Sequence, residues 1–224
     1  MRFTQSFYRA AAVCSVLSAA TTLLLIFLPK FYGPAMSFEH RLALVQHPLF
    51  QLRAWAYLLH PFLVMTAALG VAAALRRIAA NTVVPGFLGF LLWGFTEAAQ
   101  QTLTLTVFRR WANQFATADA ATRETLRNNI GLYDAIWDAM FLLLLLGFVV
   151  GNVLYALATL RGYGLTRVLS FFYFGAAFLT LTGISAELQG PTLPPLLSTW
   201  LYPLLQPAAR VLIGVWLWRQ SEPD

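Results

Sequence analysis

The chain has 224 residues, of which 59% are hydrophobic and only 11% are charged. A soluble domain usually carries about 25% charged residues, so this chain has too little polar surface to cover a water-exposed globule. The formal net charge is +6, but no long basic patch or recognition motif accompanies it, so nucleic-acid binding is not expected. The single cysteine, Cys14, excludes an intramolecular disulfide and a cysteine-based metal cluster.

Six continuous apolar runs predict an all-α, polytopic membrane helix bundle. Each run fits a helix of about 20 residues that crosses a bilayer, and none alternates as a membrane strand does. The whole chain, residues 1–224, is therefore predicted to be one transmembrane domain. The predicted spans are residues 10–29, 54–75, 83–108, 135–159, 168–186 and 195–218.

Basic residues gather beside alternate ends of these spans, before the first, in the short second and fourth connections, and after the sixth. They are Arg2, Arg9, Arg76, Arg77, Arg161, Arg167 and Arg219. All would lie on one side, which the positive-inside rule identifies as cytoplasmic. The sequence thus predicts a multi-pass protein of the bacterial inner membrane with both termini in the cytoplasm.

Two connections on the opposite side are predicted to have structure of their own. Residues 37–47 have the pattern of a short amphipathic helix, with Ser37 as its N-cap and Pro48 as its end. We expect this helix to lie along the outer membrane surface. Residues 109–129 are polar and rich in Ala and Thr, which predicts a partly helical outer loop in which Asp119 caps a turn.

The third span holds the most informative polar residues. Glu97, Gln100, Gln101 and Thr104 are spaced i, i+3, i+4 and i+7, so they form one stripe on one helix face. A carboxylate near mid-membrane costs roughly 3 kcal/mol on insertion scales, and it normally faces the bundle interior, a wet cavity or a partner. The stripe is therefore a candidate ligand-binding face.

Four polar residues from other spans complete the candidate ligand-binding site: His60, Asp134, Asp138 and Arg210. The first three lie near the outer ends of their spans, at depths compatible with the stripe. By these depths, the residues expected to share one outward-opening cavity are His60, Glu97, Gln101, Thr104, Asp134 and Asp138, while Arg210 lies nearer the cytoplasmic end of its span. The aromatic wall of the cavity is predicted to consist of Trp55, Tyr57, Tyr133 and Trp137.

Some of these residues also have purely structural interpretations. Glu97 and Arg210 fit a buried ion pair that fixes helix register. The position of Asp134 is also explained by the favourable interaction of its carboxylate with the positive end of a helix dipole. Gly147-x-x-x-Gly151 in the fourth span predicts a close helix contact.

Metal and cofactor signatures are absent from the sequence. A site built from His60, Glu97 and Asp138 lacks the paired Glu-x-x-His motifs of di-iron bundles. A haem b site would need a second axial ligand within the bundle, and the other histidines lie in the outer loop. We therefore predict no metal and no cofactor.

Several short segments are similar to those of a known family. They are residues 9–17, Arg76-Arg77, Phe95-Thr96-Glu97, Trp137-Asp138 and residues 212–217. On these segments, most of the chain resembles an uncharacterised family of six-helix bacterial integral membrane proteins, grouped as a domain of unknown function. The resemblance implies the six-helix architecture and carries no activity with it.

Three functions fit these features. The favoured one is binding of a hydrophobic small molecule or lipid, or an accessory role in a membrane complex, because aromatic walls with a few polar groups suit such a ligand. The second is an intramembrane enzyme in which Glu97 and Asp138 are catalytic candidates, acting as acid and base on a lipid-soluble substrate. The third is a proton-coupled transporter. The expected partners are the bilayer, a hydrophobic ligand, and a membrane protein or second copy of the chain.

Overall fold

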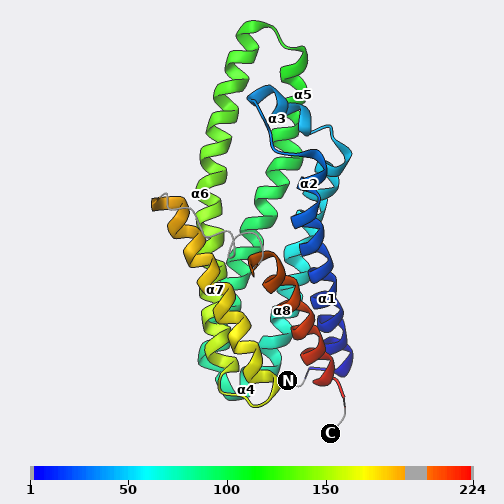
Figure 1. The fold of residues 1–224 in the computed structure, drawn as a ribbon, viewed down its shortest axis with the longest axis vertical. Coiled ribbons are helices and arrows are strands. Elements are labelled where there is room, and N and C mark those ends of the chain that lie inside the picture. The colour runs from blue at the N-terminus through cyan, green and yellow to red at the C-terminus, as the bar shows by residue number, and fades with distance from the viewer. Residues whose placement is uncertain (1–2, 190–200, 223–224) are drawn as a thin grey trace.

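The structure is a computed structural model that describes residues 3–189 and 201–222, and these residues form helices without a strand. Figure 1 shows an elongated helix bundle, which confirms the all-α prediction. The elements are α1 (Gln5–Phe27), α2 (Pro29–Tyr32), α3 (Phe38–Leu44), α4 (Pro48–Leu103), the π-helix η1 (Thr104–Phe108), α5 (Arg109–Thr117), α6 (Ala120–Thr159), α7 (Leu165–Gln189) and α8 (Tyr202–Arg219).

Four helical stretches of the described chain are long and apolar enough to cross a membrane. They are Gln5–Tyr32, Pro48–Thr117, Ala120–Thr159 and Leu165–Ser185. These stretches contain most or all of the first five predicted spans. Residues 195–200 of the predicted sixth span lie outside the described residues, and α8 covers its remainder.

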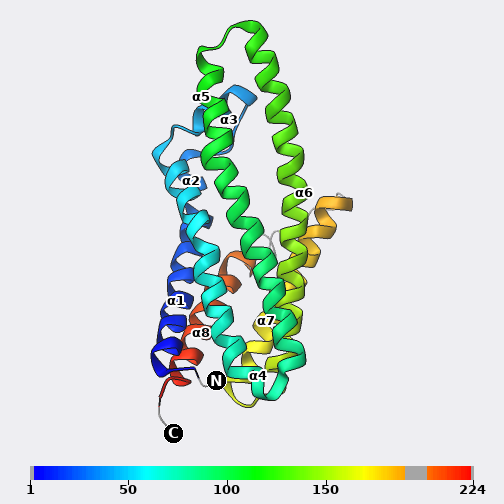
Figure 2. The same ribbon diagram turned by 180° about the vertical axis from the view of Figure 1, so that it is seen from behind.

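The stretch from Pro48 to Thr117 contains the second and third predicted spans. Ala79 interrupts α4 with non-helical dihedrals, φ −148° and ψ 37°. The chain reverses there, and the two arms of α4 run side by side in opposite directions (Figures 1 and 2). We call residues 48–78 the first arm and residues 80–103 the second arm.

The ends of the spans that carry basic residues lie together at one end of the bundle. Helix α1 begins there, α8 ends there, α4 reverses there and α6 connects there to α7 (Figure 1). The Arg76 guanidinium lies 5.2 Å from the centre of the Phe3 ring, and the Arg9 guanidinium lies 5.6 Å from that of Trp218. The predicted gathering is therefore present for the described arginines, and Arg2 lies outside the described residues; we call this end of the bundle the arginine end.

The second arm of α4 crosses α6 with their backbones in contact. A Cβ on Gly89 would lie 2.7 Å from the Gly151 nitrogen and 2.9 Å from the Gly147 carbonyl oxygen. A Cβ on Gly147 would lie 2.9 Å from the Gly89 oxygen. The close contact predicted from Gly147 and Gly151 is confirmed, and Gly89 is its counterpart on α4.

A small helical head lies at the end of the bundle opposite the arginine end. The Ser37 hydroxyl caps α3 as predicted, accepting a hydrogen bond from the His40 amide at 3.1 Å. Leu42 of α3 and the neighbouring Val45 are buried in a cluster with side chains of α5 and α6. Pro48 does not end α3. It begins α4, because a proline at the first helical position has no amide hydrogen bond to lose.

The polar segment 109–129 is more helical than predicted. Helix α5 continues from α4 through η1, and α6 begins at Ala120 rather than near residue 135. Asp119 caps α6 by accepting a hydrogen bond from the Thr122 amide at 2.8 Å. This bond from the backbone holds the pKa of Asp119 below its usual value.

We expect Gly147→Ala to lower the free energy of unfolding by about 1–3 kcal/mol, because the added methyl group meets the backbone of the second arm. Gly131→Ala is the matched control on the same helix, since nothing lies within 4 Å of its added Cβ. It should be neutral or stabilising by up to about 1 kcal/mol. Denaturant titration in detergent measures both. Equal stability of the two variants would contradict the crossing.

Candidate functional site

A cavity of about 740 Å³ lies among α1, both arms of α4, η1 and α6, with α7 and α8 contributing residues. All eight residues predicted to bind a ligand line it: His60, Glu97, Gln100, Gln101, Thr104, Asp134, Asp138 and Arg210. The structure thus brings together residues from four separate helical elements, including Arg210, whose depth in its span did not match that of the others. Ligand binding by these residues is still a prediction.

Glu97 is buried in the cavity wall without a protein partner. It lies on the second arm of α4 with only 6% of its surface exposed. No hydrogen bond or ion pair to its carboxyl group is found among the described residues. A buried carboxyl group normally has such a partner, so Glu97 is the most conspicuous polar group of the site.

The expected Glu97–Arg210 ion pair is not formed within the described part of the chain. Arg210 donates instead to the Ser18 hydroxyl and the Gln206 side-chain oxygen, both at 3.4 Å. The Ser15 hydroxyl also binds the Arg210 carbonyl at 2.6 Å, which ties α1 to α8. The interpretation of these two residues as a direct register-fixing pair is therefore wrong.

The four residues of the polar stripe differ in whether they have hydrogen-bond partners. Gln100 donates to the Trp137 carbonyl at 2.8 Å, and the Thr104 hydroxyl is 2.9 Å from that of Tyr133. These two side chains bind α4 to α6. The Gln101 side chain is buried and, like Glu97, has no hydrogen-bond partner among the described residues. All four residues line the cavity, but Glu97 and Gln101 do so without a hydrogen bond to another described residue.

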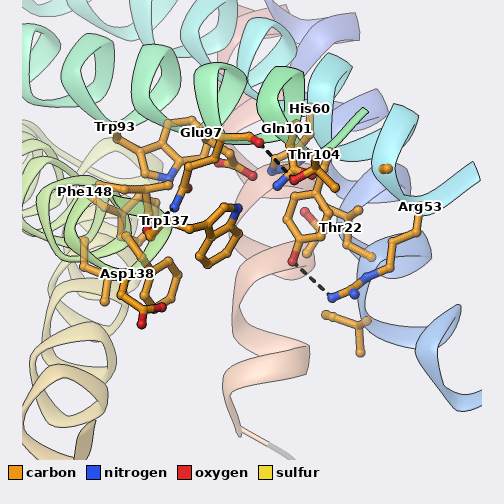
Figure 3. Close-up of a pocket in the computed structure, with 18 of the residues that line it drawn as sticks. Thr22, Arg53, His60, Trp93, Glu97, Gln101, Thr104, Trp137, Asp138 and Phe148 are labelled. Atoms are coloured by element: carbon orange, nitrogen blue, oxygen red, sulfur yellow. Dashed lines mark hydrogen bonds between the residues drawn. The ribbon is translucent and has the colours of Figure 1, made fainter. Parts of the chain in front are cut away.

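Only one of the two ring nitrogens of His60 has a hydrogen-bond partner among the described residues. Its Nδ1 atom is 2.7 Å from the Thr21 hydroxyl, and its ring packs edge-on against Trp93 at 6.0 Å between centres. Its Nε2 atom has no hydrogen-bond partner within the described residues. The described part of the chain contains no group of three His, Cys, Asp or Glu side chains placed to hold a metal ion. Figure 3 shows His60, Glu97 and Gln101 close together around the cavity.

The two aspartates of α6 lie farther out. Asp134 accepts two hydrogen bonds from the Arg41 guanidinium of α3, at 2.7 and 2.5 Å. This bonding raises the pKa of Arg41 above its usual value. Because α6 begins at Ala120, Asp134 lies mid-helix, and its interpretation as a charge in the first turns is wrong. Asp138 is exposed at the cavity edge.

The aromatic wall differs in part from the prediction. Tyr57, Tyr133 and Trp137 line the cavity, whereas Trp55 is 52% exposed and does not. Trp93 and Phe148 line the cavity although they were not among the predicted wall residues. The wall is therefore more apolar at its inner part than the sequence suggested.

Arg53 is a cavity residue that the predicted site omits. It lies on the first arm four residues before Tyr57 and seven before His60, so the three share one helix face. This spacing alone indicates that Arg53 belongs to the same face as the predicted cavity residues. The guanidinium lies 5.0 Å from the centre of the Tyr57 ring.

The π-helix η1 lies where the second arm passes the cavity. Thr104 and Phe108, its first and last residues, both line the cavity. A π-helix widens the helix by one residue per turn and is frequent at functional sites. Here it coincides with the outer end of the polar stripe.

Comparisons with known proteins identify no relative. No protein-family model, no curated protein and no solved structure matches the chain. The resemblance to a six-helix family therefore stays a prediction, and the candidate function rests on the site itself.

The bidentate Arg41–Asp134 pair should couple more strongly than the exposed pair Arg127–Glu39, which has a single bond of 3.2 Å. A double-mutant cycle with alanine substitutions measures each coupling. We expect about 1 kcal/mol for the first pair and a few tenths of a kcal/mol for the second. Equal coupling energies would show that α3 is not held to α6 at the cavity edge.

Proposed function

We propose that this is a membrane protein whose cavity binds a hydrophobic or amphipathic small molecule, such as a lipid. The observation that carries this proposal is the burial of Glu97 and Gln101 in an aromatic-lined cavity without protein partners. Small-molecule sites are typically cavities of about 300–1,000 Å³ with mostly apolar walls and a few convergent polar groups. The polar atoms of both side chains are accessible from the cavity, where a ligand would supply the hydrogen bonds that the described residues do not.

Binding accounts for the site better than catalysis or transport does. Catalysis would require Asp138 to act with Glu97, but Asp138 is exposed at the cavity edge, whereas Glu97 is buried in the cavity wall, and no hydrogen bond among the described residues joins the two. Toward the arginine end, Arg210 and Gln206 line both this cavity and an adjoining pocket of only about 50 Å³. A transport path would need a wider continuation.

We further propose six membrane spans: α1, the two arms of α4, the inner part of α6, α7 and α8. Large apolar side chains such as Leu23, Phe171 and Phe178 are exposed on the outer faces of this bundle, which suits contact with lipid. The arginine end would face the bacterial cytoplasm, and the head with α3 would lie outside. Such a protein could also serve as an accessory subunit, using the same outer faces toward a membrane partner.

Mass spectrometry of the gently extracted protein, with lipid identification, tests the proposed binding. We expect one amphipathic molecule to co-purify with the wild-type chain. The double variant Glu97→Gln, Gln101→Leu should retain about tenfold less of it, because hydrogen bonds to a charged group contribute about 1.5–3 kcal/mol. Thr102→Val is the matched control, since Thr102 is exposed on the same arm. A wild-type chain without any bound molecule would contradict the proposal.

Cysteine labelling tests the proposed orientation. In a Cys14→Ala background, a cysteine at Ala121 in the head should react with a membrane-impermeant thiol reagent added to whole spheroplasts. A cysteine at Tyr163, which is 90% exposed in the connection between α6 and α7 at the arginine end, should react only after the membrane is opened. The reverse pattern would show that the arginine end faces outward.

A further inference from the structure

Arg53 is a cation in the cavity wall without a counter-ion. Its terminal nitrogens donate to the hydroxyl groups of Tyr32 at 3.2 Å and Tyr57 at 3.4 Å, and Figure 3 shows it at one side of the cavity. No carboxylate among the described residues lies within ion-pair distance of it. An arginine has five N–H donors, and these two bonds use only two. The Nε atom is buried without any acceptor.

Three other arginines in the same half of the molecule have their charges satisfied by the protein. Arg41 binds Asp134, and Arg127 binds Glu39. Arg123 donates to the backbone carbonyl groups of residues 115 and 116. Arg41 and Arg53 both line the cavity, but Arg41 has a carboxylate partner, whereas within the described residues Arg53 donates hydrogen bonds only to neutral hydroxyl groups.

The surroundings of Arg53 favour an anion that presents two oxygen atoms side by side. A guanidinium group presents N–H donors in a rigid fork that matches the oxygen atoms of a carboxylate or phosphate. The Tyr57 ring, whose centre lies 5.0 Å from the guanidinium carbon, is within range of a cation–π contact with this fork. The cavity wall nearby is largely apolar, and a charge in such surroundings gains more from an opposite charge than one in water does.

We propose that the ligand carries an anionic group of the phosphate or carboxylate type, which binds Arg53. This inference rests on the proposed ligand-binding function and specifies its chemistry. Arg53 lies seven residues before His60 on the first arm, about 10 Å farther toward the head. The anion therefore lies toward the head, and the apolar part of the ligand contacts Trp93 and Phe148 deeper in the cavity. Glu97 and Gln101 bind hydrogen-bond donors between these two regions.

Calorimetric titration of the full chain in a neutral maltoside detergent tests this assignment. The probes share one alkyl chain and differ in their head groups: dodecyl phosphate, dodecanol and dodecyltrimethylammonium. Inorganic phosphate is the fourth probe and distinguishes a lipid-like source of the anion from free phosphate. The variants are Arg53→Gln, Arg53→Lys, and Arg123→Gln as the control outside the cavity. Arg53→Lys keeps the charge but loses the fork, and it also serves if Arg53→Gln does not fold.

We expect dodecyl phosphate to bind about tenfold more tightly than dodecanol, as one charge-assisted contact would give. Arg53→Gln should abolish this difference, Arg53→Lys should reduce it, and Arg123→Gln should leave it unchanged. Inorganic phosphate that binds as tightly as dodecyl phosphate, again through Arg53, would support the anion site and identify its source as free phosphate. Equal binding of all three amphiphiles, or tightest binding of the cation, would overturn this inference and leave the proposed function standing. Binding of no amphiphile at all would overturn both.

Discussion

The backbone contact between the second arm of α4 and α6 determines where the cavity lies. At Gly89, Gly147 and Gly151 no side chain separates the two helices, so they meet closely there. Figure 2 shows them drawing apart toward the head. Larger side chains, beginning with Trp93 and Phe148, fill the widening space only in part. The cavity is what remains between this wall and the helices α1 and α4.

That geometry also explains which polar groups have partners. Gln100 and Thr104 lie on the side of the second arm that faces α6, where a backbone carbonyl and a tyrosine hydroxyl are within reach. Glu97 and Gln101 share the same stripe and line the same cavity, but no described residue hydrogen-bonds to their side chains. Because lipid and apolar side chains offer no hydrogen bonds, a polar group that faces such a cavity depends on water or a ligand. The division of one stripe into bonded and unbonded members is the physical basis of the proposed site.

The head contributes to the site by holding the outer ends of its helices. Arg41 of α3 binds Asp134 of α6 at the cavity edge, and Leu42 and Val45 are buried beside it. Helix α5, which continues α4 through η1, is joined to α6 by the short break at residues 118–119. These contacts set the separation of the two helices on the side away from the glycine crossing.

Periodicity made much of the site predictable. A spacing of i, i+3, i+4 and i+7 places Glu97 to Thr104 on one face whatever the packing, and continuous apolar runs locate the helices. The same reasoning favours Tyr57 over Trp55, since two residues along a helix point to nearly opposite faces. Arg53 was not predicted to line the cavity because a basic residue near a span end is usually explained by contact with lipid headgroups.

Other features depend on information that one sequence does not contain. The start of α6 at Ala120 was missed because a polar, exposed helix has no apolar run to mark it. The relation of Glu97 to Arg210 depends on the relative rotation of α4 and α8, which side-chain packing sets. The ion pair that the sequence suggested between Glu97 and Arg210 is therefore not formed, and the two residues line the cavity separately.

The most direct test of this account is a cryo-electron microscopy structure of the protein in lipid nanodiscs. The account predicts non-protein density in the cavity that reaches from Arg53 past Glu97 and Gln101 to the ring of Phe148. It also predicts that Glu97 and Arg210 stay apart. A cavity that has closed, with the Glu97 carboxylate bound directly to the Arg210 guanidinium and no additional density, would contradict it.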